Sequence, residues 1–246
     1  MYSTPLGPHE AALRAYFHGD TSATLNVRSD LGEDDDLPVE IFFRGPDDFF
    51  PFERHALEQC RGRVLDLGAG TGVHSLALQD RGMEVCAVEV VEGVAQIMRE
   101  RGVLEVVAAD FFELDPESIA PADTILMLMN GIGPAGTLDR VPALLDRLAK
   151  LIEPDGQVLL DSGSANLQPG HDRQTSDWPP RTGDYVGEAW VRLAFRGEAG
   201  PPFRELYADF DTLAARVRGA GWTCEQIFGE GPDNFVARLR PSALSF

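Results

Sequence analysis

The sequence predicts an α/β fold in which helices cover both faces of a doubly wound, mostly parallel sheet. From residue 63 onward, short apolar or β-branched runs alternate with amphipathic helical stretches. Such alternation requires right-handed crossovers, which place parallel strands side by side with helices on either face. The first run ends in a loop with glycine at positions 68, 70 and 72, at the edge where a doubly wound sheet holds its ligand.

The regular part of the chain contains five predicted strands, at residues 63–68, 84–89, 104–110, 123–130 and 156–162. The segments between them are predicted helices at residues 73–81, 91–101 and 138–152, with a short piece near 116–119. Pro142 is expected in the first turn of the last helix, where its missing N–H does no harm.

Residues 1–62 are predicted to form an N-terminal cover packed on the core. A helix over residues 9–18 precedes two β-like runs within 24–43, which we interpret as a hairpin. Asp34, Asp35 and Asp36 are expected in the solvated turn of that hairpin. A helix over residues 50–60 then leads into the first strand of the main unit, which we take to be residues 63–246.

The pattern changes after the fifth strand, where an insertion is predicted at about residues 164–207. It opens with a long loop rich in Pro, Gly and polar residues, and loops of that length are usually functional. Two strand-like runs follow at 188–197 and 204–209; the first of them pairs either within the chain or with another subunit. A helix over 210–221 and an antiparallel hairpin at 222–240 close the sequence.

Composition excludes several classes of function. The net charge of −19, from 40 acidic and 21 basic residues, argues against a nucleic-acid partner. No apolar run approaches the roughly 18 residues of a membrane span, and the N-terminus lacks the pattern of a secretory signal. The three cysteines are widely spaced, which favours reduced thiols in a cytoplasmic protein, and no ligand spacing indicates a metal.

The spacing of the glycine loop narrows the choice of ligand. A triphosphate loop requires a lysine after its last glycine, and none follows here. A dinucleotide loop has its third glycine at position 73, where this chain has Val73, and this weakens the dinucleotide alternative without excluding it. Glu89 ends the second strand, about as many residues after the glycine loop as an acid that binds ribose hydroxyls. Asp110 and Phe111 end the third strand, where an acid and an aromatic ring suit an adenine. An adenosyl ligand without phosphate fits these features best.

The motifs VLDLGAGTG at 64–72, AVE ending at Glu89, AADFF at 108–112 and LMLMNGIG at 126–133 occur in this order along the chain. Together they resemble the successive motifs of class I S-adenosylmethionine-dependent methyltransferases. The resemblance covers roughly residues 63–162, and the closing helix and hairpin fit the same family. It implies a seven-stranded sheet in the order 3-2-1-4-5-7-6, with strand seven antiparallel and the methyl donor bound across strands one to four.

The same resemblance implies roles for individual residues. The loop residues would approach the methionine and ribose portions of the donor; they are Gly68, Ala69, Gly70 and Gly72. Asp66 would position the donor's ammonium group, Glu89 would hold the ribose, and Asp110 with Phe111 would frame the adenine. Asn130 and Gly131 leave the fourth strand where the sulfonium methyl should face the acceptor.

Histidines supply the candidates for a catalytic base, because a protonated acceptor must lose a proton and histidine titrates near neutral pH. The candidates are His74 at the start of the helix after the glycine loop, His171 in the long loop, and His55 in the helix before the first strand. Simple packing or exposure is the alternative for each of them.

The acceptor site has three further candidates. Arg44 could pair with a carboxylate of the donor or substrate, or with one of the many nearby acids. Trp178 and Tyr185 lie in the long loop and could line an aromatic pocket.

The function predicted from these features is methyl transfer from S-adenosyl-L-methionine to a small molecule at O, N or C, with S-adenosyl-L-homocysteine as product. A peptide acceptor and either a monomer or a homodimer stay open. One alternative is a non-catalytic module that binds S-adenosylmethionine; a lesser one is an NAD-dependent dehydrogenase, which would use the same sheet and Glu89.

Overall fold

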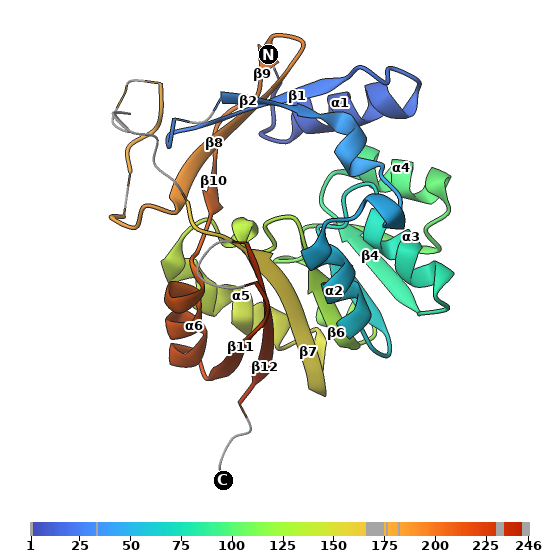
Figure 1. Ribbon diagram of the computed structural model, residues 1–246, viewed down its shortest axis with the longest axis vertical. Coiled ribbons are helices and arrows are strands. Elements are labelled where there is room, and N and C mark those ends of the chain that lie inside the picture. The colour runs from blue at the N-terminus through green and yellow to red at the C-terminus, as the bar shows by residue number, and fades with distance from the viewer. Residues whose placement is uncertain are drawn as a thin grey trace.

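The computed structural model describes residues 2–32, 34–165, 175, 177–181, 183–229 and 234–242. These residues form two sheets, a larger one in the lower part of Figure 1 and a smaller one above it. None of the helices in the described residues combines the length and apolar character that a bilayer crossing requires.

The larger sheet has seven strands in the order β11-β12-β7-β6-β3-β4-β5. Its strands are β3 (Val64–Leu67), β4 (Val85–Glu89), β5 (Glu105–Ala108), β6 (Ala122–Met127), β7 (Ile152–Ser162), β11 (Trp222–Phe228) and β12 (Phe235–Pro241). β12 runs antiparallel to both of its neighbours, and the pairs from β5 to β7 are parallel. The predicted fold class, strand order and antiparallel strand are therefore confirmed.

Helices cover both faces of this sheet. They are α2 (Pro51–Gln59), α3 (Val73–Asp80), α4 (Glu92–Arg101), α5 (Val141–Leu148) and α6 (Phe210–Gly219). Short 3-10 turns join the elements: η1 (Val39–Phe42), η2 (Pro46–Asp48), η3 (Pro116–Ser118), η4 (Gly133–Ala135) and η5 (Leu138–Arg140). The helix predicted over 138–152 is shorter than expected, because β7 begins at Ile152 and its first residue is already paired with β6.

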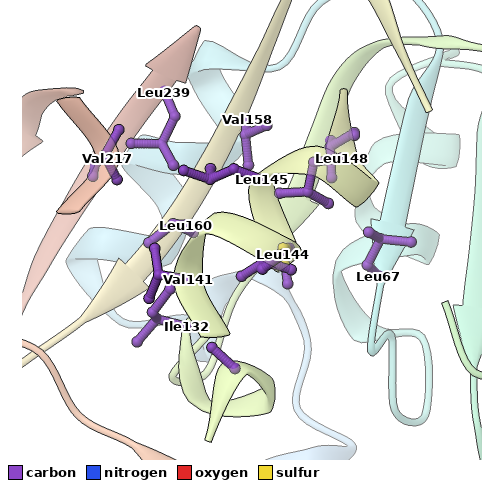
Figure 2. Close-up of a cluster of buried hydrophobic side chains, with 14 of the residues drawn as sticks. Leu67, Ile132, Val141, Leu144, Leu145, Leu148, Val158, Leu160, Val217 and Leu239 are labelled. Atoms are coloured by element: carbon purple, nitrogen blue, oxygen red, sulfur yellow. The ribbon is translucent and has the colours of Figure 1, made fainter. Parts of the chain in front are cut away.

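The main core lies between the sheet and the pair α5 and α6. Figure 2 shows Leu144, Leu145 and Leu148 of α5 in one cluster of side chains with Val158 and Leu160 of β7. All five side chains are buried, so the apolar face of α5 is fully covered. On the opposite face of the sheet, side chains of α2 and α3 pack against β6, β7 and β12. Burial on both faces accounts for the nearly continuous apolar runs of the central strands.

The smaller sheet joins segments that are far apart in the sequence, in the order β10-β8-β1-β2. Its strands are β1 (Thr24–Ser29), β2 (Asp34–Pro38), β8 (Glu188–Phe195), β9 (Glu198–Ala199) and β10 (Phe203–Leu206), with β9 paired to β8. Both edges of β8 are occupied within the chain, by β1 and β10. The strand-like run at 188–197 therefore pairs internally rather than with another subunit.

One face of this small sheet is buried against helices. Ala189, Val191 and Leu193 alternate along β8 into a cluster with α1 (Gly7–Phe17) and with Val94 and Ile97 of α4. Because α4 also packs on the larger sheet, it connects the two layers. Phe195 joins the same cluster, and the side chains of Trp190, Arg192 and Ala194 lie on the outer face.

The three aspartates at 34–36 occupy a different place from the predicted turn. They lie within β2, paired with β1 through Asn26 opposite Asp36, and Asn26 Nδ2 donates to Asp34 and Asp36. β2 is the edge of the small sheet, and a row of exposed carboxylates there discourages pairing with another chain. The predicted hairpin itself is present.

Candidate active site

The glycine loop joins β3 to α3 and has an unusual backbone. Gly68, Gly70 and Gly72 have φ values of +74°, +57° and +81°, which side chains rarely adopt. A Cβ atom added to Gly68 or Gly70 would meet nothing within 4 Å, whereas one at Gly72 would lie 2.7 Å from Val103. The first two glycines therefore border open space, and the third allows α3 and its neighbours to pack closely.

Glu89 lies at the end of β4, directly beside this loop. Its Oε2 accepts a hydrogen bond from the Gly70 N–H at 3.1 Å, and its Oε1 accepts one from the Val91 N–H at 2.9 Å. The side chain is buried, and burial raises the pKa of its carboxyl, although the backbone hydrogen bonds act in the opposite direction. Glu89 is thus held directly beside the glycine loop.

Asp66, in β3, lies beneath the loop and is buried. Its Oδ2 accepts a hydrogen bond of 2.6 Å from the Ser75 hydroxyl, which ties β3 to the first turn of α3. Burial raises the pKa of the Asp66 carboxyl. One of its two oxygens is therefore engaged by the protein itself, and this contact fixes the angle at which α3 leaves the loop.

The two residues expected at the adenine lie in different environments. Asp110 is exposed after β5, and its Oδ1 accepts a hydrogen bond from the Phe112 N–H at 2.9 Å. Phe111 is buried in the main core and stacks on Phe112 with ring centroids 4.5 Å apart. Asp110 is open to a ligand, while Phe111 contributes mainly to the packing under that edge of the sheet.

The chain leaves β6 through a strained turn. Met129 and Asn130 both have positive φ, at +66° and +63°, and a Cβ at Gly131 would lie 1.9 Å from the Met127 carbonyl oxygen. Asp161, at the end of β7, holds this turn: its two oxygens accept hydrogen bonds from the N–H groups of Asn130 at 3.0 Å and Gly131 at 2.9 Å. Burial raises the pKa of Asp161 to about 6 despite these bonds.

The side chain of Asn130 connects the turn to the small sheet. Its Nδ2 donates to Glu205 Oε1 of β10 at 3.2 Å, and the Tyr207 hydroxyl donates to Glu205 Oε2 at 3.2 Å. Asn130 Oδ1 is buried and has no hydrogen-bond donor among the residues that the structure describes. Asn130, expected near the transferred methyl, therefore faces the cover as well as the larger sheet.

His74 and Arg44 converge on a buried acid, Glu53 of α2. Glu53 Oε1 lies 2.6 Å from His74 Nε2 and accepts a hydrogen bond from Arg44, and Glu53 Oε2 accepts one from the Phe50 N–H at 2.7 Å. Burial alone would raise the pKa of Glu53, but His74 and Arg44 outweigh it and lower the pKa to about 2. Of the two alternatives for Arg44, the salt bridge to a nearby acid is the one found.

The other candidates contact other parts of the fold or lie outside the described residues. His55 packs against Phe228 of β11, with ring centroids 5.5 Å apart. His171 lies outside the described residues. The Arg192 guanidinium lies 5.1 Å from the Trp178 ring, on the outer face of the small sheet, and Tyr185 donates to Asp209 at the start of α6.

Three residues important to this geometry were not predicted from the sequence: Glu53, Asp161 and Glu205. Asp161 is the acid of the DSGS segment that ends the fifth strand, and its position there was the available signal. Glu53 and Glu205 are single acids among 40 acidic residues. Nothing in the local sequence distinguishes them, because their roles depend on packing between distant segments.

Comparison with known proteins assigns the family. A model of the methyltransferase domain family matches residues 43–226, which is most of the chain. The structure of an S-adenosylmethionine-dependent methyltransferase from Bacteroides fragilis, in complex with S-adenosyl-L-homocysteine, is 32% identical with a TM-score of 0.83. The match covers 99% of this chain and 98% of that one. The chain therefore belongs to the class I S-adenosylmethionine-dependent methyltransferase family, as its motifs indicated.

Curated relatives match over shorter lengths. The cypemycin N-terminal methyltransferase of a Streptomyces species is 34% identical over 101 residues, which is 40% of this chain and 40% of that protein. The biotin biosynthesis bifunctional protein BioHC of Cellvibrio japonicus is 29% identical over 102 residues, which is 42% of this chain and 20% of that protein. The chain thus spans less than half the length of these two relatives, and their similarity supports the family rather than an acceptor.

Proposed function

We propose that this protein is an enzyme that transfers the methyl group of S-adenosyl-L-methionine to a small-molecule acceptor. The observation that carries the proposal is the open cradle at Gly68 and Gly70 with the Glu89 carboxylate held beside it. A nucleoside with free ribose hydroxyls and no phosphate fits a bare backbone next to an acid, since vicinal hydroxyls donate to a carboxylate.

The residues around the cradle suit the donor in other respects. Space at Gly68 and Gly70 is left open by the backbone, so a ligand can touch the chain directly. Glu89 would hold the ribose and Asp110 the adenine amine, while Asp66 supports the loop from beneath. Bound there, S-adenosylmethionine supplies a methyl group on a positively charged sulfur.

The protein's own contribution is mainly positional. The turn at Met129, Asn130 and Gly131 is fixed in a strained conformation by Asp161, which sets the place where an acceptor would meet the methyl group. In-line transfer requires three collinear atoms, and holding reactants in such a geometry supplies several kcal/mol, on the order of 7–11 in favourable cases. A rigid turn at this position therefore lowers the barrier to methyl transfer more than a mobile one would.

The small sheet and α1 are proposed to cover the acceptor. Partly buried aromatic residues pack against the cluster between the small sheet and α1, among them Tyr16, Phe43 and Tyr207, and the first two stack with centroids 4.7 Å apart. A largely apolar wall with a few polar groups is typical of small-molecule sites. The acidic protein surface makes a nucleic-acid acceptor unfavourable.

His74 acts in this proposal by positioning rather than by taking the acceptor's proton. It is buried, and its Nε2 is engaged with Glu53. It forms the second residue of α3, so the Glu53 contact anchors the helix that follows the glycine loop. His171 stays a predicted base. All three cysteines are free thiols, which supports a reducing, cytoplasmic setting.

Calorimetric titration tests the proposal directly. Wild type and the variants Glu89→Ala and Glu92→Ala are titrated with S-adenosylmethionine, S-adenosylhomocysteine and NAD⁺. Glu92 is an exposed acid of α4 paired with Arg99 at the surface, so its variant is the control for loss of charge. Binding of the first two ligands, lost only in Glu89→Ala, supports the donor site. Binding of NAD⁺ alone would refute it.

A further inference from the structure

The inner face of the small sheet carries one acid directly over the turn that leaves β6. Glu205 of β10 pairs in register with Ala189 of β8, and opposite residues of antiparallel strands point to the same face. Ala189 is fully buried in the cluster with α1, so Glu205 lies on the inward side. A Cβ on Gly133 would lie 2.8 Å from both Glu205 Oε1 and Asn130 Nδ2, which places the acid against this turn.

The orientation of the Asn130 amide follows from the same contact. Its Nδ2 faces a Glu205 oxygen at 3.2 Å, and exchanging the amide atoms would bring two acceptor oxygens together. Asn130 Oδ1 is thus fixed as the buried atom, and no donor among the described residues reaches it. A buried carbonyl oxygen in this state is a place for an N–H or O–H donor, which a ligand or a water molecule supplies.

The chemistry of Glu205 and Asn130 favours some classes of methyl acceptor over others. Glu205 places a carboxylate against the Asn130 amide, and Asn130 Oδ1 adds a second hydrogen-bond acceptor on that amide. A carboxylate would be repelled there. A hydroxyl could donate one hydrogen bond but brings no charge, whereas an amine donates several and carries or develops a positive charge.

We propose that the methyl acceptor is an amine, bound through its N–H groups by the Glu205 carboxylate and Asn130 Oδ1. This inference rests on the proposed methyltransferase function and names the class of its acceptor. Glu205 and Asn130 are then substrate-binding residues at the junction of the two sheets. Phe43 and Tyr16 of the cover would face the apolar part of the same molecule.

The transfer step gives the carboxylate a second role. The neutral amine nitrogen uses its lone pair to form a bond to the methyl carbon, while the electron pair of the carbon–sulfur bond stays on sulfur. The nitrogen keeps its hydrogen atoms and becomes a positively charged ammonium, which later releases a proton to water. Positive charge therefore grows on the atom next to Glu205, and an acid placed there stabilises the transition state more than the ground state.

The test compares ligands of one shape with different polar groups. Benzylamine, benzyl alcohol and benzoate are titrated calorimetrically into wild type saturated with S-adenosylhomocysteine, and into Glu205→Gln and Glu198→Gln. Glu198 is an exposed acid of β9 in the same sheet, so Glu198→Gln removes an equal charge away from Asn130. Wild type and Glu198→Gln are expected to bind benzylamine at least tenfold more tightly than benzyl alcohol. Glu205→Gln should lose that preference.

The outcome of these titrations either supports or overturns the inference that the methyl acceptor is an amine. Equal binding of amine and alcohol by wild type, no measurable amine binding, or a preference that survives in Glu205→Gln overturns it. The wild-type comparison alone suffices if Glu205→Gln does not fold. Failure of S-adenosylhomocysteine to bind would instead refute the proposed function, and titration of the ligand-free protein would still report whether Glu205 selects an amine.

Discussion

Substitution of Glu53 by glutamine should destabilise the protein strongly, because Glu53 is the shared partner of two buried groups. Its side chain is 0% exposed, and those of Arg44 and His74 are 7% and 6% exposed. Glu53→Gln keeps the size of the side chain and an oxygen for the Phe50 N–H. It removes the negative charge that compensates the Arg44 guanidinium, which then remains buried.

Two arguments give a similar magnitude for this effect. Removing one partner of a buried ion pair typically costs about 3–5 kcal/mol. The pKa of Glu53 falls from its ordinary value of 4.5 to about 2 on folding, and at 1.36 kcal/mol per pKa unit this corresponds to about 3 kcal/mol. For a chain of this size, a loss of about 3 kcal/mol lowers Tm by roughly 6–12 °C.

Urea unfolding at pH 7, repeated between pH 5 and pH 2, measures both the loss and its origin. Since the folded pKa of Glu53 is depressed, its contribution is complete above about pH 4.5 and disappears as the pH falls towards 2. The difference between wild type and Glu53→Gln should therefore shrink over that interval. Glu58→Gln, an exposed position on the same helix, is the control and should stay within about 0.5 kcal/mol of wild type.

The double variant Glu53→Gln/Arg44→Met separates charge from packing. Arg44 lies near the rings of Phe49 and Phe50, where a methionine side chain can pack. If an uncompensated guanidinium causes the loss, the double variant should recover part of the stability. A Glu53→Gln protein within 1 kcal/mol of wild type at pH 7 would contradict the argument, as would a difference independent of pH.

Three other substitutions give separate tests of the site. Glu89→Gln should raise the Kd for S-adenosylhomocysteine by about tenfold or more in calorimetry, since it removes the charge next to Gly70; unchanged affinity would show that the acid does not bind the ribose. Gly70→Ala should weaken the same binding, because its Cβ points into the cradle. Its φ of +57° costs about 1–2 kcal/mol, which lowers Tm by roughly 2–8 °C. A loss of stability with unchanged binding would contradict an open cradle. Asp161→Asn should flatten the dependence of stability on pH in urea titrations. Burial raises the pKa of Asp161 to about 6, so the folded wild type binds a proton first and gains stability as the pH falls from about 6 to about 4; a variant with an unchanged profile would locate that titration elsewhere.

Much of the larger sheet could be predicted from the sequence because its signals are local. The runs that became β3, β4 and β7 are apolar on both faces, and the stretches that became α3 and α4 have a helical period. Glycines 68, 70 and 72 revealed the donor loop because positive φ leaves few alternatives to glycine. The strand order followed from the family resemblance carried by these motifs.

The pairing of the small sheet could not be predicted in the same way. The sequence showed strand-like runs in both segments, but the partnership of β1 with β8 depends on contacts between residues far apart in the chain. The roles of Glu53 and Glu205 could not be predicted for the same reason, because their partners His74 and Asn130 come from other elements. Asp34 to Asp36 were misplaced because a polar edge strand and a polar turn have the same composition.

The long-range pairing of β1 with β8 has a consequence for synthesis on the ribosome. Asp30, just after β1, binds the N–H of Trp190 across 160 positions of sequence. At translation rates of roughly 5–20 residues per second, the emerged hairpin waits roughly 8–30 s for its partner strand to be made. During that delay the edge of β1 that will pair with β8 is unpaired. The carboxylates of β2 discourage pairing only at the opposite edge of the hairpin. The nascent chain is therefore most prone to aggregation before β8 leaves the exit tunnel, and slower elongation over residues 40–190 should lower the yield of folded protein.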